Sequence, residues 1–200
     1  MDDRVLKTED VLNIHSIFTE NNWFTKIGQD EVHKNLCNLL VNLTPEQKDL
    51  VMDLSRRYLW LSLSEYTGLL LEILDKVEDE KLIKCDRIVL FPIIIPEDEG
   101  KIKSSSPLLY MFKAAYFGGP RYKNIKFQVI ESYEDLIHED FKEKDLIFLV
   151  DDYVGSGDTL FSTLEEIKKN KSAKDEIINI ISLVAQKETL SELNRKGIAW

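Results

Sequence analysis

Two adjacent acids followed by a turn rich in glycine and serine are the part of this sequence that could do chemistry. Residues 146–160 read Leu-Ile-Phe-Leu-Val-Asp-Asp-Tyr-Val-Gly-Ser-Gly-Asp-Thr-Leu, which is an apolar strand, two carboxylates, a tight turn and the start of a helix. The free backbone N–H groups at the start of a helix can hold a phosphate. This order of parts suits a ligand with a phosphate at one end and sugar hydroxyls a few ångströms away.

The residues of the turn have the properties that phosphate binding requires. Gly155 and Gly157 allow the backbone to approach an anion closely and to adopt positive φ. Ser156 and Thr159 offer hydroxyl donors, and a helix N-terminus favours negative charge by roughly 0.3 to 1 kcal/mol when it is exposed. Asp158 is the exception, because a carboxylate repels a phosphate. We expect its side chain to point away from the ligand, cap the helix or reach a metal.

Other interpretations share parts of this pattern. A buried strand followed by a helix that Asp158 or Ser156 caps would explain one acid, but not the pair that precedes the turn. A response-regulator receiver needs a further Asp and a Lys on later strands, and the next predicted strand, residues 177–185, ends without an acid. A Walker B strand needs a Walker A loop, which residues 100–101 do not form.

Residues 147–160 resemble the phosphoribosyl-pyrophosphate (PRPP) signature of the type I phosphoribosyltransferases: four apolar residues, two acids, two variable residues and a Thr/Ser-Gly-x-Thr-like loop. The resemblance implies that residues 155–159 hold the 5-phosphate. It also implies that Asp151 and Asp152 hold the ribose hydroxyls and stabilise the positive charge of an oxocarbenium-like state. Mg²⁺ would be the cofactor, held mainly through the ligand and not by a protein site.

The resemblance also suggests where the rest of the substrates bind. The family binds pyrophosphate with the loop after its first core strand, and here that loop offers Lys101, Lys103, Ser104 and Ser105. A solvated loop that leads into a capped helix explains the same residues.

Base contacts in the family commonly follow a later strand, where this chain has Gln186 and Lys187. Many members also close a long catalytic loop over the substrates. The corresponding interval, residues 131–145, is short and rich in acids here, so we expect a weak lid or none.

The secondary structure that the sequence predicts differs between the first part of the chain and the rest. Residues 1–84 are helical in pattern, with helices near 9–19 and 30–42 and a third from Pro45 to Val77 that Gly68 could interrupt. From residue 86, short apolar strands (88–95, 125–130, 146–150, 177–185) alternate with helices. This alternation predicts an α/β fold with a mainly parallel twisted sheet of the type I phosphoribosyltransferase kind, and ligands at the carboxyl ends of the strands.

We therefore expect a helical appendage, 1–84, and a phosphoribosyltransferase-like α/β domain, 85–200. The chain stops at Trp200, directly after a helix-ending glycine and where the next strand would begin, so the domain looks truncated at its C-terminal end.

Composition limits the classes of partner. The formal net charge of -10 disfavours a broad nucleic-acid surface, and no run approaches the roughly 20 apolar residues that cross a bilayer. A cytoplasmic location is the default. Cys37 and Cys85 are then expected to be reduced packing residues. A homodimer or a partner protein could form through the helical region.

Two functions follow as expectations. The first is a phosphoribosyltransferase, a glycosyltransferase that moves the phosphoribosyl group of PRPP to an unidentified acceptor and releases pyrophosphate. The alternative is a catalytically degenerate module that senses PRPP or a nucleotide and acts through a partner. The Asp-Asp-Tyr-Val-Gly-Ser-Gly variant also resembles a divergent branch of the family found in prokaryotic conflict systems.

Overall fold

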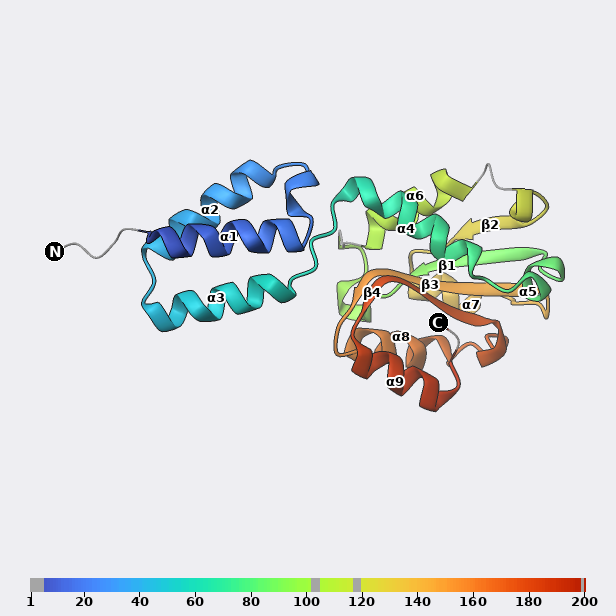
Figure 1. Ribbon diagram of the computed structural model, residues 1–200. Coiled ribbons are helices and arrows are strands. Elements are labelled where there is room, and N and C mark those ends of the chain that lie inside the picture. Colours follow the sequence, from blue (N-terminus) through green and yellow to red (C-terminus); the bar gives the residue numbers. More distant parts are fainter. Residues whose placement is uncertain (1–5, 102–104, 117–119, 199) are drawn as a thin grey trace. The chain divides into compact units, whose positions relative to one another are not determined.

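The computed structural model describes residues 6–101, 105–116, 120–198 and 200, and the chain divides into two compact units, Met1–Leu63 and Ser64–Trp200 (Figure 1). The sequence suggests a boundary after residue 84 instead. The difference arises because α4 (Leu63–Asp75) and α5 (Asp79–Ile83) bury apolar side chains in the same core as the sheet. These two helices belong to the α/β unit.

The first unit consists of α1 (Thr8–Glu20), α2 (Gln29–Val41) and α3 (Pro45–Arg57), with a short 3-10 helix at Trp23–Thr25. Helix α3 begins with a reciprocal capping box. The Thr44 hydroxyl accepts from the Gln47 N–H, and the Gln47 side chain accepts from the Thr44 N–H. The buried core of this unit is Ile14, Ile17, Phe18, Trp23, Leu40 and Met52.

The single helix predicted from Pro45 to Val77 is wrong, because the structure contains two. Helix α3 ends at Arg57, and Tyr58 turns to extended backbone with φ -78° and ψ 123°. Residues 58–62 have no helical or strand structure, whereas Gly68 lies inside α4. Helical spacing of apolar residues continues across the break, so spacing alone does not reveal it.

The second unit is built on a parallel sheet of β1 (Arg87–Pro92), β2 (Lys126–Val129), β3 (Asp145–Val154) and β4 (Ile178–Ala185), in the order β2-β1-β3-β4. The central strands are almost entirely buried, as expected for a parallel sheet covered on both faces. The carboxyl end of β1 lies beside β3, with Pro92 opposite Val150, and β3 continues to Val154.

Helices cover both faces of this sheet (Figure 1). On one face α7 (Tyr133–His138), α8 (Asp158–Ile167) and α9 (Lys187–Lys196) enclose a core with Val89, Ile147 and Leu149. On the other, α4, α5 and α6 (Ser105–Tyr116) pack around Leu90, Phe148 and other side chains. Short 3-10 helices occur at Pro96–Asp98, Pro120–Tyr122 and Asp175–Ile177.

Two strands end elsewhere than the sequence predicts. Strand β1 stops at Pro92 and not at Ile95, although the Ile93 N–H still donates to the Val150 carbonyl at 3.0 Å. Strand β3 runs past the two acids to Val154, since Tyr153 and Val154 still pair with β4. The aspartates therefore lie within a strand and not beyond its end.

Among the described residues, no helix is long and apolar enough to cross a membrane.

Candidate functional site

A cleft of about 260 Å³ lies where β3 turns into α8. It is lined by Ile93, Asp151, Tyr153, Val154, Gly155, Ser156, Gly157, Asp158, Thr159 and Leu160. The structure thus brings Asp151 together with all five residues predicted to hold a phosphate. Asp152, Lys101, Ser105, Gln186 and Lys187 do not line this cleft.

The two glycines of the turn differ in how strictly their positions require glycine. Gly157 has φ +90°, and a Cβ there would lie 2.7 Å from Phe161 Cε2 and 2.9 Å from Thr189 Cγ2. At Gly155 a Cβ would meet the Tyr153 ring at 3.2 Å. Phe161 and Thr189 therefore leave no room for a side chain at Gly157, whereas Tyr153 restricts Gly155 less strictly.

The N-terminus of α8 is not capped by a side chain. Its N-cap is Gly157, and no side chain accepts a hydrogen bond there. The alternative in which Asp158 or Ser156 caps the helix is therefore wrong. The Ser156 hydroxyl instead donates to Asp158 Oδ2 at 2.7 Å, which gives that carboxylate a local partner. The orphan N–H groups of the first turn are left for another acceptor.

The side chain of Asp151 is partly buried, and burial disfavours the charged form of its carboxyl group. Its pKa is raised to about 7, first by burial and also by the neighbouring carboxylate of Asp152, while a hydrogen bond from the Asp152 N–H at 2.9 Å acts in the opposite direction. Among the described residues no cation forms an ion pair with it. A ligand with hydroxyl donors, or a bound cation, would relieve this cost.

Asp152 faces a different neighbour. Its Oδ2 accepts a hydrogen bond from the Tyr66 hydroxyl of α4 at 3.2 Å. The two aspartates therefore differ in environment, although they are adjacent in sequence. Their predicted roles toward the ribose hydroxyls stay predictions.

The loop after β1, where the sequence suggests pyrophosphate binding, is only partly described. Lys103 and Ser104 lie outside the described residues. Lys101 is exposed and donates to Asp98 Oδ1 at 2.7 Å. Ser105 begins α6, and its buried hydroxyl has no hydrogen-bond partner among the described residues. The base of this loop is fixed, because the Ile94 carbonyl accepts from Thr163 at 2.8 Å and from Tyr133.

The junction between β4 and α9 contacts the turn from behind. The Gln186 side-chain amide donates to the Tyr153 hydroxyl at 2.9 Å, and its backbone N–H donates to the Val154 carbonyl at 3.0 Å. Thr189 donates its hydroxyl to the Gly155 carbonyl. Lys187 is exposed at the start of α9. The predicted base-binding role of Gln186 and Lys187 stays a prediction.

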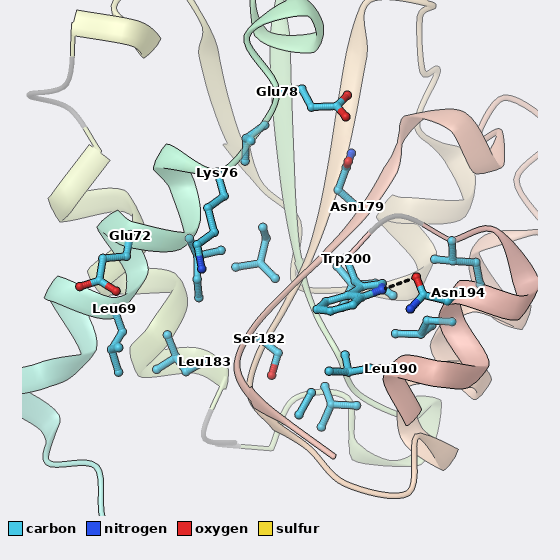
Figure 2. A pocket seen from close by; sticks show the side chains of 18 of the residues that line it. Leu69, Glu72, Lys76, Glu78, Asn179, Ser182, Leu183, Leu190, Asn194 and Trp200 are labelled. Carbon is cyan, nitrogen blue, oxygen red and sulfur yellow. Dashed lines mark hydrogen bonds between the residues drawn. The ribbon is translucent and has the colours of Figure 1, made fainter. Parts of the chain in front are cut away.

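A larger cavity of about 730 Å³ runs along the outer edge of β4 (Figure 2). Side chains of α4, α5 and α9 line it together with β4, and the Trp200 indole donates to Asn194 Oδ1 at 3.0 Å. None of the predicted site residues is in its lining. Its walls are largely apolar, and the charged side chains in its lining are those of Glu72, Lys76, Glu78 and Lys81.

Sequence reasoning missed three residues that contact this site: Tyr153, Tyr66 and Thr189. Tyr153 stands at a variable position between the acids and the turn, and its alternation with Asp151 along the strand is a signal that both line one cleft. Tyr66 and Thr189 come from helices remote in sequence and carry no such signal.

The PRTase-CE family model matches residues 18–199. The chain belongs to the PRTase-CE family. This is a phosphoribosyltransferase-type family, and the parallel α/β sheet is consistent with such a fold. The match includes the cleft at the end of β3 as well as most of the helical unit. Comparisons with curated proteins and with solved structures gave no match.

Membership settles the family level of the function. The chain is a phosphoribosyltransferase-like protein, which confirms the resemblance seen at residues 147–160. The fold predicted from the alternation of strands and helices is confirmed as well.

Proposed function

We propose that this chain binds PRPP with Mg²⁺ in the cleft beside α8 and transfers its phosphoribosyl group to an acceptor, with release of pyrophosphate. One observation carries the proposal. The uncapped start of α8 and the desolvated carboxyl group of Asp151 open into the same cleft. The first suits a phosphate and the second suits the hydroxyls of a pentose.

The 5-phosphate would occupy the turn formed by residues 155–159. Backbone N–H groups there have no side-chain cap, and the helix dipole adds a favourable field. The hydrogen bond from the neutral Ser156 hydroxyl does not remove the negative charge of the Asp158 carboxylate, so the backbone donors must outweigh its repulsion of the ligand. Binding therefore depends mainly on backbone donors and not on cationic side chains, none of which lines the described cleft.

The ribose would lie against the aspartates. Hydroxyl donors satisfy a buried carboxylate and lower the cost of its charge. An ionised Asp151 beside the ring would then stabilise the positive charge that develops at the anomeric carbon. Asp152 keeps acceptor capacity beyond its bond with Tyr66, since a carboxylate can accept several hydrogen bonds.

The described residues contain no group of three or more His, Cys, Asp or Glu side chains that could hold a metal. In this proposal Mg²⁺ would be held chiefly by oxygen atoms of the ligand, with Asp151 and Asp152 as the carboxylates of the site. When bound, the ion supplies charge that offsets the negative charge of departing pyrophosphate. Lys101 and Lys103 are the candidates for a protein contribution to the same task.

A second candidate function is a PRPP or nucleotide sensor, which the interval between β2 and β3 favours. Instead of a long loop, this interval contains α7, whose Tyr133 and Leu136 are buried in the core. A segment packed in this way is poorly suited to closing over substrates. A chain that cannot close over its substrates would bind PRPP or a nucleotide without turning it over.

Thermal denaturation with and without PRPP plus Mg²⁺ tests the shared binding step. A ligand at about 100 times its Kd adds about 2.7 kcal/mol to the free energy of unfolding. We expect wild type to be stabilised and Asp151→Asn/Asp152→Asn to lose most of that effect. The matched control is Glu165→Gln, an exposed carboxylate on α8, which should respond as wild type does.

A pyrophosphate-release assay with purine, pyrimidine and nicotinate-type acceptors separates the two candidates. Release that depends on one acceptor supports the transferase. Stabilisation without release supports the sensor. Equal stabilisation of wild type and of the double aspartate variant contradicts both.

A further inference from the structure

Thr189 places a buried hydroxyl behind the phosphate-binding turn. The residue is only 2% exposed and lies in the first turn of α9. The N-cap of α9 is Gln186, three positions earlier, so Thr189 is not the capping residue of its own helix. Its hydroxyl donates instead to the carbonyl of Gly155, 34 positions away in the sequence.

This bond orients one peptide group of the turn. The chain has no cis peptide bonds among its described residues, so the Gly155 carbonyl and the Ser156 N–H point in opposite directions. Holding the carbonyl toward α9 directs the Ser156 N–H away from α9. Thr189 does not line the cleft, whereas Ser156 does. An anion in the cleft then meets an N–H and not a carbonyl oxygen.

An anchor of this kind is needed because glycines flank Ser156. Backbone next to glycine rotates with little steric resistance, so the turn alone does not select one orientation of this peptide group. The Thr189 methyl group packs on the turn as well, since a Cβ on Gly157 would lie 2.9 Å from it. The Gln186 N–H holds the adjoining Val154 carbonyl.

We propose that Thr189 is a positioning residue for the phosphate subsite: it fixes the peptide group between Gly155 and Ser156 so that an N–H faces the ligand. This inference rests on the proposed binding of a phosphorylated ribose in the cleft. It assigns to the β4–α9 junction a role in phosphate affinity.

The test compares two substitutions that separate the hydroxyl from the methyl group. Thr189→Val keeps the shape and removes the donor, and Thr189→Ser keeps the donor. Calorimetric titration with ribose 5-phosphate, and with PRPP plus Mg²⁺, should show a Kd at least about tenfold higher for the valine variant and within about threefold of wild type for the serine variant. Ser191→Ala is the control, because that exposed hydroxyl donates only within α9.

The Ser156 amide resonance, measured without ligand, reports the orientation directly. It should shift in Thr189→Val and stay in place in Thr189→Ser. Thermal unfolding without ligand checks that both variants are folded.

Wild-type affinity in the valine variant, or an equal loss of affinity in both variants, overturns the inference. If wild type binds neither ligand, the proposed function fails and the role in phosphate affinity fails with it. An amide shift in the valine variant alone would then show only that the Thr189 hydroxyl orients this peptide group.

Discussion

Asp151 is the residue whose chemistry depends most on its surroundings. Its carboxyl group is desolvated, lies beside a second carboxylate and borders the cleft. Its pKa in the folded chain, about 7, lies above the ordinary value of 3.8. The folded state therefore holds the proton more tightly than the unfolded state does.

This shift predicts how stability depends on pH. The contribution of the protonated group is fully present below pH 4 and is lost as pH rises through about 7. Asp151→Asn removes the ionisation, so at pH 8 the variant should melt about 3 °C or more above wild type, and the difference should shrink toward pH 4. Calorimetric melting across this range is the measurement. Glu165→Gln should give no such pH dependence, and parallel curves for Asp151→Asn and wild type would contradict the assignment.

Gly157 is required for two reasons, its positive φ and the lack of space for a Cβ. Gly157→Ala should lower the free energy of unfolding by about 1–3 kcal/mol, as overpacking does in tight sites. Gly68→Ala is the matched control, because Gly68 lies in α4 and a Cβ added there would have no atom within 4 Å. That change should stabilise the protein by about 0.5–1 kcal/mol. Urea denaturation distinguishes these outcomes, and equal effects of the two changes would contradict the packing described.

At the residue scale, the sequence predicts the turn at residues 155–159 better than it predicts the contacts that distant residues make with the site. Residue types alone indicate that Gly155 to Thr159 form a bare turn before a helix, and these residues do line one cleft with Asp151. The bond from Tyr66 to Asp152 could not be predicted, because the two residues are 86 positions apart and no local pattern links them.

At the scale of elements, one carbonyl joins the loop after β1 to α8. The Ile94 carbonyl is buried and accepts from two hydroxyls, those of Thr163 and Tyr133, which also lie 3.3 Å from each other. The loop that leads toward α6 is thereby tied to the helix that begins at the phosphate-binding turn. The two halves of the proposed site are held in register by this contact.

A double-mutant cycle measures that tie. Thr163→Val and Tyr133→Phe each leave the carbonyl with one donor and should cost about 1 kcal/mol. The double variant leaves it with none, so its loss should exceed the sum by about 0.5 kcal/mol or more. Urea denaturation of the four proteins gives the coupling energy. Strict additivity would show that the two hydroxyls act independently.

Elements were predictable where local signals are strong. The capping box at Thr44 and the positive φ of Gly197 after α9 follow from residue types. The continuation of β3 through Tyr153 and Val154 was not predictable, because it depends on pairing with Val184 and Ala185 of β4. The break at residues 58–62 was likewise hidden by apolar spacing that runs through it.

At the scale of the whole molecule, the chain consists of two units joined near residue 63. The helical unit has its own core, and α3 exposes Leu50 and Leu54, each 58% accessible. A homodimer or partner protein through this unit stays a prediction, as does the cytoplasmic location.

Limited proteolysis should find the junction between the units. Residues 58–62 lack helix and strand, and Tyr58 and Leu59 are 63% and 60% exposed. Chymotrypsin should cut there first and leave the α/β unit intact, because exposed irregular segments are preferred sites. Tyr110, which is 76% exposed but inside α6, is the internal control and should be cut later. A first cut within the α/β unit would contradict this division.

Amide NMR of the full chain during titration with PRPP and Mg²⁺ tests the central claim most directly, because it reports the ligand and its place together. We predict saturable shifts of the backbone resonances of residues 155–159, which Asp151→Asn/Asp152→Asn weakens. No saturable shift, or shifts confined to residues outside this turn, would contradict the account.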